Sequence, residues 1–438
     1  MAALSERRPD SQFAALFVVM LAIAGGNTAL LSVLPALGRS LGVPDSGIAA
    51  AFSISAFAWV IAAPRWARRS DHRGRRRMVL IGMTGFTVSL LLCGVMLTAG
   101  IRGWVHPLVA FGGFIVARLI YGMFGAAAPP ATQALVAART SRAGRTRALT
   151  LLASAFGLGT ILGPALAPFL VLPFVGLAGP AFIFALGGLA VIVIVLRSLP
   201  DDAPGARSDP DDGAHGAANA YPALGSQPTG ASVTAAAADR DATDVAMRDP
   251  RVWPWLLSGL VLGHAQAMTG QAIAFLVMDR LALPPSAAQD SIGIVLMIGA
   301  GAALLVQWGI IPLLDLRPRA LMLCGVAISA LGCALTGFAD SLYGIATAYA
   351  LASAGFGFSR PGFTASASLA VGSHEQGAVA GRVTAINGAA YVLGPSIGVG
   401  LYQAWQPLPY WIAAGGLALL LFYIWVRLER GSAEDGLA

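Results

Sequence analysis

The chain has 438 residues, of which 57% are apolar and only 11% are charged, and its mean hydropathy is +0.73. This composition excludes an ordinary soluble protein and indicates a membrane protein. The net charge is +7, and every basic side chain other than histidine is an arginine, since the sequence contains no lysine. A membrane topology accounts for this positive charge without a nucleic-acid partner.

Apolar runs of about 18 residues or more are long enough to cross a bilayer as helices. The runs predict an all-α membrane protein with twelve transmembrane helices in two pseudo-symmetric six-helix bundles, residues 1–197 and 253–438. Residues 198–252 are rich in Asp, Ala, Pro and Gly and poor in large apolar side chains, which predicts a disordered cytoplasmic linker. The twelve spans are expected near residues 12–37, 46–64, 78–99, 107–134, 148–172, 180–196, 253–278, 289–314, 321–338, 342–371, 383–404 and 410–426.

The arginines predict the orientation of these spans. With a cytoplasmic N-terminus, most of the 28 arginines lie on the cytoplasmic side, and only Arg39, Arg102 and Arg280 lie outside. Because arginine accumulates in cytoplasmic loops, we expect both termini in the cytoplasm, and the membrane to be a bacterial cytoplasmic membrane. The three cysteines lie in or beside apolar runs without ligand spacing, so neither a disulfide framework nor a metal site is expected.

The two halves carry matching residues at matching places. Asp45-Ser46-Gly47-Ile48 opens the second span, and Asp290-Ser291-Ile292-Gly293-Ile294 opens the eighth. About 25 residues later, each of these spans ends in an aspartate followed by arginines, Asp71 in SDHRGRRR and Asp315 in LDLRPRA. Repeated halves with a binding site at their interface are typical of transporters, whereas an enzyme or receptor does not require them.

Three motifs in the first half resemble signatures of the major facilitator superfamily. Span 4 contains R-x-x-x-G, and span 5 contains G-x-x-x-G-P but ends in Ala167-Pro168 where the family has two glycines. The loop from Ala67 to Arg76 resembles G-x-x-x-D-R-x-G-R-R/K, with Ala67 and His72 departing from it. The matching residues are Asp71, Gly74, Arg75 and Arg76 in the loop, Arg118 and Gly122 in span 4, and Gly159, Gly163 and Pro164 in span 5.

The resemblance covers nearly the whole chain and is closest to the twelve-span drug:proton antiporters, the multidrug efflux group. It implies a gating role for Asp71, Gly74, Arg75 and Arg76, with Asp71 paired against the positive N-terminus of span 11. Asp315 is the corresponding residue of the second half, and Gly159, Gly163 and Pro164 form a hinge or seal. The alternative for the aspartates and arginines is a solvated loop that stays in the cytoplasm because of its positive charge. The alternative for the glycines and Pro164 is ordinary helix packing.

None of the 21 acidic residues lies in the middle of a span, and the centre of span 1 carries Asn27 and Thr28 instead. The ionisable residues that remain near mid-membrane are Arg118, Arg360 and His264. Since histidine titrates near neutral pH, His264 is the first candidate for proton coupling, and Asp71 acting through Arg118 is the competing route. A purely structural role for His264 is an equally good interpretation.

Polar, aromatic and methionine side chains on inward-facing spans predict the substrate cavity, although the same residue types also pack helices. The candidates are Asn27, Ser55, Trp59, Tyr121, Met268, Gln271, Phe356, Asn387 and Tyr391.

We therefore expect a secondary active transporter, an exporter of drug-like or amphipathic organic compounds driven by protons through alternating access. The alternative is a carrier of an organic anion that uses Arg118 and Arg360. A membrane sensor or enzyme would need a nucleotide loop, a nucleophile elbow or a zinc helix, and the sequence has none of these. The expected partners are a small-molecule substrate, protons and the lipid bilayer. We expect a monomer with no cofactor and no nucleic acid.

Overall fold

The computed structural model describes residues 9–140, 142–200, 245–285, 287–314, 316–372 and 375–434, and helices account for nearly all of them. The first half contains α1 (Pro9–Ser40), α2 (Asp45–Arg73), α3 (Arg75–Ile101), α4 (Pro107–Phe124), η1 (Gly125–Ala127), α5 (Ala128–Arg139), α6 (Arg142–Leu166), η2 (Ala167–Leu170) and α7 (Gly179–Ser198). The second half contains α9 (Trp253–Arg280), α10 (Gln289–Leu304), η3 (Leu305–Ile310), α11 (Ile311–Leu314), α12 (Pro318–Phe338), α13 (Leu342–Leu369), α14 (Gln376–Ala404) and α15 (Leu408–Glu434).

Every predicted span corresponds to one helix or to consecutive helical segments. The span predicted at 107–134 is α4 followed by the 3-10 segment η1 and by α5. Pro129 and Pro130 explain this break, because neither can donate a backbone N–H to the carbonyl four residues earlier, in Gly125 or Ala126. Most of the predicted linker, residues 201–244, lies outside the described residues.

Ten of the described helical runs are long and apolar enough to cross a membrane. α13 and α14 are not among the ten, yet they have 28 and 29 residues and are as long as the others. Both are rich in small and polar residues, which suits helices packed inside a bundle better than helices facing lipid. The all-α fold with two bundles is confirmed, and the structure is consistent with twelve spans.

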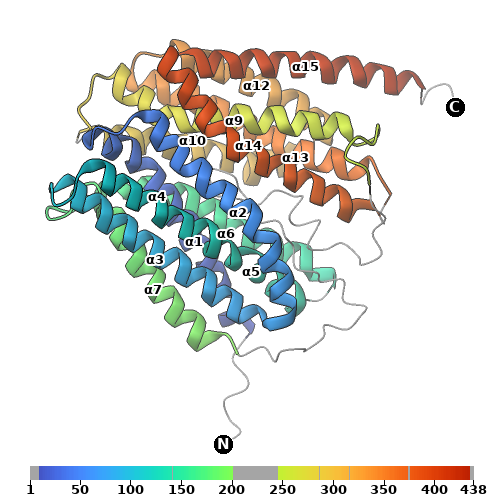
Figure 1. The fold of residues 1–438 in the computed structure, drawn as a ribbon. Helices are drawn as coiled ribbons and strands as arrows, with labels where there is room; N and C mark the ends of the chain where they lie inside the picture. Colours follow the sequence, from blue (N-terminus) through green and yellow to red (C-terminus); the bar gives the residue numbers. More distant parts are fainter. Residues whose placement is uncertain are drawn as a thin grey trace, which may run out of the picture.

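The same pairs of helices pack together in each half. In the first half, α1 packs against α6, α3 against α4, and α3 against α7. The equivalent pairs of the second half are α9 with α14, α12 with α13, and α12 with α15. Figure 1 shows the two groups as neighbouring bundles, α1–α7 in blue to green and α9–α15 in yellow to red. This correspondence supports the internal repeat that the sequence motifs predict.

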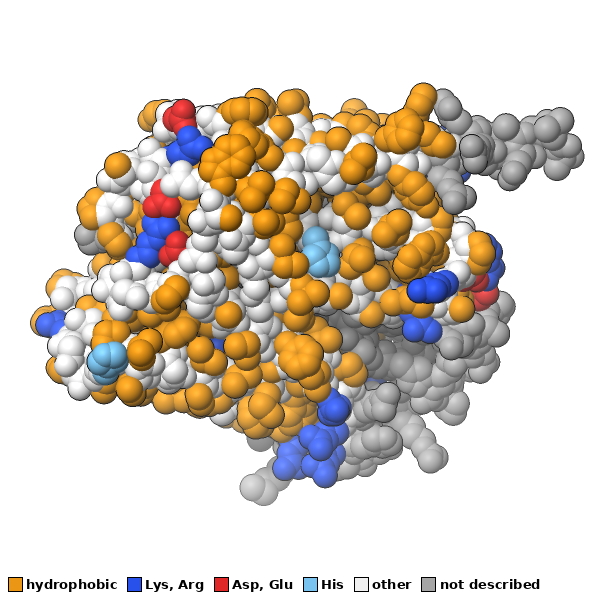
Figure 2. Space-filling view, turned by 45° about the horizontal axis from the view of Figure 1, so that its top comes forward, with side chains coloured by type: hydrophobic (Ala, Val, Ile, Leu, Met, Phe, Trp, Pro, Cys, Tyr) orange, Lys and Arg blue, Asp and Glu red, His pale blue; other side chains and the backbone are white. Residues whose placement is uncertain are grey.

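The helices of both bundles run between two ends of the molecule, here called the Arg39 end and the Gly74 end. Charge distribution along the sequence predicts that the Arg39 end faces outward and the Gly74 end faces the cytoplasm. Figure 2 shows a face covered mainly by hydrophobic side chains, with charged side chains gathered toward its margins. Large apolar residues such as Phe57, Leu186 and Leu419 are exposed on the protein surface, as expected for helices in contact with lipid.

The two halves pack against each other at the Arg39 end. One hydrophobic cluster contains residues of α1–α7 together with residues 272–278 of α9 and Tyr402 of α14. The residues of α9 nearer the Gly74 end, such as Leu256, belong to a separate cluster made only of the second half. α2 packs along α14 and α6 packs along α10. The described conformation is therefore closed at the Arg39 end.

Candidate transport site

Arg118 lies inside the first half, on α4, with its side chain almost fully buried. Its Nη2 donates a hydrogen bond to Oδ1 of Asn27 on α1, at 2.9 Å. The guanidinium carbon lies 4.8 Å from the centre of the Phe52 ring and 4.7 Å from that of Tyr121. Aromatic faces and a neutral amide attract the positive charge without neutralising it.

Gly122 of the span 4 motif allows α4 to approach α2 closely at this place. A Cβ atom on Gly122 would lie 2.4 Å from the backbone oxygen of Ser55, and the Ser55 hydroxyl donates to the Arg118 carbonyl at 2.9 Å. Trp59 packs against Tyr121 with ring centres 5.1 Å apart. This close helix contact holds Arg118 between α1 and α2.

Arg360 occupies the equivalent helix of the second half, α13, and is also buried. Its Nη2 donates to Oδ1 of Asn387 at 3.0 Å, and its Nη1 donates to the Tyr391 hydroxyl at 3.1 Å, both residues lying on α14. The Tyr391 hydroxyl donates in turn to Oε1 of Gln266 on α9, at 3.4 Å. Each half therefore holds a buried arginine against an asparagine oxygen and a tyrosine.

Among the side chains that the structure describes as buried, the charged ones are Arg118 and Arg360, and none is an aspartate or glutamate. Burying a cation without an acidic partner costs on the order of several kcal/mol, because the charge loses its hydration. The hydrogen-bond partners of both charges are neutral, Asn27 for Arg118 and Asn387 and Tyr391 for Arg360.

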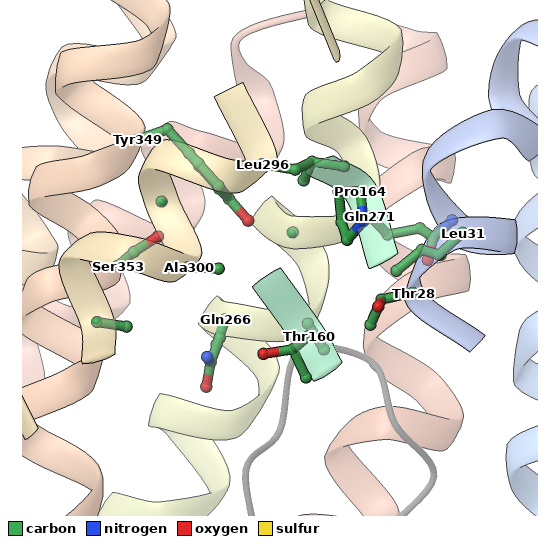
Figure 3. Close-up of a pocket in the computed structure, with 14 residues that line it drawn as sticks. Thr28, Leu31, Thr160, Pro164, Gln266, Gln271, Leu296, Ala300, Tyr349 and Ser353 are labelled. Carbon is green, nitrogen blue, oxygen red and sulfur yellow. The ribbon is translucent and has the colours of Figure 1, made fainter. Parts of the chain in front are cut away.

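A cavity of about 100 Å³ lies between the two halves. Its lining comes from α1 and α6 of the first half and from α9, α10 and α13 of the second (Figure 3). The hydroxyls of Tyr349 and Ser353 point into this space, and the Thr160 hydroxyl points toward it from the opposite side. The labelled lining residues are Thr28, Leu31, Thr160, Pro164, Gln266, Gln271, Leu296, Ala300, Tyr349 and Ser353. The cavity surface is therefore uncharged and combines polar with apolar side chains.

Arg118 and Arg360 are not among the residues that line this cavity, but a chain neighbour of Asn27 and a hydrogen-bond partner of Tyr391 are. Thr28, which lines the cavity, follows Asn27 in the chain, and Gln266, which also lines it, accepts from Tyr391. Gln271 lies in the lining with a side chain only 3% exposed. Neither of its amide atoms has a hydrogen-bond partner in the part of the chain that the structure describes. An unsatisfied buried amide favours a ligand that can both donate and accept.

His264 lies on a different side of α9. Its Nδ1 is 2.9 Å from the Leu260 carbonyl of its own helix, and its side chain lines a separate groove between α9 and α15 together with Ile412 and Gly416. It is absent from the lining of the cavity between the halves. Its role in proton coupling stays a prediction, and this location favours the structural alternative.

His264→Gln distinguishes the two roles, because glutamine can still hydrogen-bond to the Leu260 carbonyl but cannot carry a proton. From its place outside the cavity lining, we expect the variant to keep at least about half of the wild-type efflux driven by an imposed pH gradient. The measurement is efflux from proteoliposomes with and without the gradient. Loss of gradient-driven efflux together with intact exchange at equal pH would instead establish His264 as the carrier.

The basic loop between α2 and α3 turns at Gly74, which has a φ of 90° and is therefore at a position that suits glycine. Nη1 of Arg75 donates to the Ala134 carbonyl at 3.2 Å, and Nη2 of Arg76 donates to the Leu196 carbonyl at 2.9 Å. The Leu196 carbonyl lies in the last turn of α7, where cations are favourable, and the Ala134 carbonyl lies midway along α5. Asp71 belongs to α2, but its side chain, like the whole of Asp315, lies outside the described residues, so both gating roles stay predictions.

Gly159 and Gly163 bring α6 against α1 within the first half. A Cβ on Gly159 would lie 2.5 Å from the Leu21 backbone oxygen, and one on Gly163 would lie 2.4 Å from that of Gly25. Pro164 lines the cavity and also lies against α10, since a Cβ on Gly293 would be 3.1 Å from its backbone oxygen. The structure therefore gives these residues a packing role, and a hinge role is untested.

Of the other candidate substrate residues, Phe356 and Met268 are buried in the hydrophobic cluster of the second half. Thr160, Tyr349 and Ser353 also line the cavity and were not among the residues expected there from the sequence. Tyr349 and Ser353 are four residues apart on α13 and share a face of the helix, which is the signal that could have identified them.

Comparisons with known proteins agree with this geometry. The sequence matches the family model described as Major Facilitator Superfamily over residues 16–317 and again over 308–436. A search of curated proteins found no match.

Several solved structures have a similar fold. The human organic anion transporter MFSD10 (TETRAN) is 19% identical, with a TM-score of 0.61, over 95% of this chain and 100% of that one. The nucleoside transporter NupG is 15% identical with a TM-score of 0.66, over 95% and 98%. The POT family transporter PepTSo is 13% identical with a TM-score of 0.68, over 98% and 100%.

The family model covers both halves of the chain, and its members are transporters rather than enzymes. With two repeated helical bundles and a cavity between them, this integral membrane protein belongs to the Major Facilitator Superfamily of secondary transporters.

Proposed function

We propose that this transporter carries amphipathic organic anions. The observation behind the proposal is the pair of buried arginines, Arg118 and Arg360, in a protein interior without a described buried carboxylate. An anion in the cavity between the halves would be stabilised by both positive charges, and the apolar and amide-bearing lining suits the organic remainder of the molecule. The similar fold of MFSD10, described as an organic anion transporter, agrees with this class.

In this proposal, Asn27, Tyr121, Asn387 and Tyr391 hold the two arginines in place, and Trp59 supports Tyr121. Gln271 contacts the substrate directly, since its amide lines the cavity without a partner among the described residues. Phe356 remains a weaker candidate because it packs in the core of the second half.

A second candidate function is proton-driven export of neutral or cationic drug-like compounds. The uncharged, partly apolar lining of the cavity favours it, as does the resemblance of the three motifs to those of drug:proton antiporters. In either function we propose a monomer in a bacterial cytoplasmic membrane with both termini inside. Asp71, Gly74, Arg75, Arg76 and Asp315 gate its cytoplasmic end.

Transport of two dyes of opposite charge separates these candidates. The purified chain is reconstituted into proteoliposomes, and movement of fluorescein, an anion, is compared with that of rhodamine 6G, a cation, under an imposed pH gradient. We expect fluorescein to move faster than in protein-free liposomes and rhodamine 6G to move at the protein-free rate. Transport of rhodamine 6G alone would overturn the anion proposal and favour drug export.

A further inference from the structure

A groove lies on the surface of the second half, between α9 and α15, and we call it the His264 groove. Its volume is about 300 Å³, which is in the range of small-molecule sites and far exceeds the room that one water needs. Its lining comes from one face of α9 and one face of α15. Of the described residues that line it, His264 alone has a polar side chain.

Small residues leave this groove hollow. Ala265 on α9 and Ala413 and Gly416 on α15 line it and contribute almost no side-chain volume. A Cβ on Gly416 would still be 4.0 Å from Cγ1 of Val261 on α9, so the two helices do not close the space between them. Ile412, which also lines the groove, is 45% exposed. The groove is therefore open to the surface that faces the hydrocarbon of the bilayer.

The hydrogen bonding of His264 determines what its ring offers to this groove. His264 lies near the middle of α9, and its Nδ1 is 2.9 Å from the Leu260 carbonyl oxygen. That oxygen can only accept, so Nδ1 carries the hydrogen and donates it. In a neutral ring, which apolar surroundings favour, Nε2 then has a lone pair and can only accept. Within the described part of the chain, Nε2 has no hydrogen-bond partner.

An occupant of the His264 groove has to donate to Nε2 and also be stable in hydrocarbon. A lipid acyl chain would fill the apolar space but has no donor. An ammonium or carboxylate compound would bring a charge into the bilayer that no residue of the lining neutralises. A phenol combines one strong O–H donor with a flat, uncharged, apolar body. Its ring also suits Met268 in the lining, because a thioether packs favourably against aromatic rings.

We propose that the His264 groove binds a lipid-soluble phenol, which enters from the bilayer and donates a hydrogen bond from its hydroxyl to Nε2 of His264. This site is distinct from the cavity between the halves. Gln266, two residues further along α9, lines that cavity, whereas His264 does not. The proposal is therefore independent of the compound that the protein transports, and a failure of either one leaves the other intact.

The test measures binding of tritiated nonylphenol to the full-length chain in lipid nanodiscs, with empty nanodiscs to subtract partition into lipid. Unlabelled nonylphenol and its methyl ether then compete with the labelled compound. The ether has the same apolar body but no hydroxyl hydrogen. We expect saturable binding, and we expect the ether to compete about tenfold more weakly, as for the loss of one hydrogen bond. The absence of saturable binding, or equal competition by the two compounds, would overturn the proposal.

His264→Phe keeps an aromatic ring in the groove and removes the acceptor. We expect nonylphenol and its methyl ether to compete equally well in this variant, because neither can then form the hydrogen bond. A tenfold preference for the phenol that persists without the imidazole would show that the hydroxyl binds elsewhere.

A pair of neighbouring glycines gives a test that does not depend on the folding of His264→Phe. Gly416→Leu places a large side chain in the groove and should abolish saturable binding. Gly415→Leu is the matched control, because a Cβ on Gly415 meets no atom within 4 Å and Gly415 does not line the groove. We expect this control to bind nonylphenol like the wild type. Equal binding by the two leucine variants would contradict the site.

Discussion

Arg118→Met is expected to reduce organic-anion transport by about tenfold or more while leaving the melting temperature of the purified protein unchanged or higher. Removing a charged interaction with a bound anion is worth about 1.5–3 kcal/mol, which corresponds to this loss. Replacing an unpaired buried charge by an apolar side chain of similar size removes a desolvation penalty, so the fold does not suffer. Loss of transport with retained stability is what separates a substrate-stabilising cation from a structural one.

The measurement is initial fluorescein transport in proteoliposomes, with thermal unfolding followed on the same preparations. Arg118→Lys should restore transport only in part, because an ammonium lacks the planar fork that bonds to Asn27 and lies over the Tyr121 ring. Arg102→Met is the matched control, since Arg102 is exposed and donates to the Phe174 carbonyl at the Arg39 end. Arg118→Met with wild-type transport would show that the buried charge does not contribute to substrate binding.

Gly163→Ala is expected to destabilise the protein by about 1–3 kcal/mol and to abolish most transport, because the added methyl group overpacks the contact between α1 and α6. The new Cβ would lie 2.2 Å from the Thr28 hydroxyl oxygen, 2.4 Å from the Gly25 carbonyl oxygen and 2.8 Å from the Ala29 nitrogen. Two of these atoms are backbone, so the helices have to move apart. Thr28 lines the cavity, which is why the displacement reaches the transport site.

Gly187→Ala in α7 is the control for this substitution. A Cβ on Gly187 meets no atom within 4 Å, so alanine there should be neutral or slightly stabilising, as expected for glycine replaced inside a helix. Both variants are compared by thermal unfolding and by yield of monodisperse protein after purification. Equal stability of Gly163→Ala and Gly187→Ala would contradict the close packing of α6 on α1.

The sequence by itself determined the fold class of this protein. Long apolar runs form helices in a bilayer, because each backbone polar group there needs a partner within the protein. The number of such runs therefore predicts the number of membrane-spanning helices. The span 5 glycines also allowed a close approach of helices to be predicted, and the contact of Gly163 with Gly25 shows it, whereas the contact of Gly122 with Ser55 was not predicted. Arg118 could be recognised as a candidate because a charge inside a span is unfavourable and is retained for a reason.

Only the tertiary structure decided which polar side chains face the same space. Asn27 and Arg118 are 91 residues apart, and Arg39 and Asp279 are 240 apart, so no local pattern could pair them. His264 and Gln266 are two residues apart on α9, yet the first lines the outer groove and the second the cavity between the halves. The physical reason is that hydropathy records how buried a helix is, whereas its rotation about its own axis is set by the packing of small residues against neighbouring helices. That rotation is a property of the assembled bundle, and it determines whether a polar residue contacts substrate, proton or lipid.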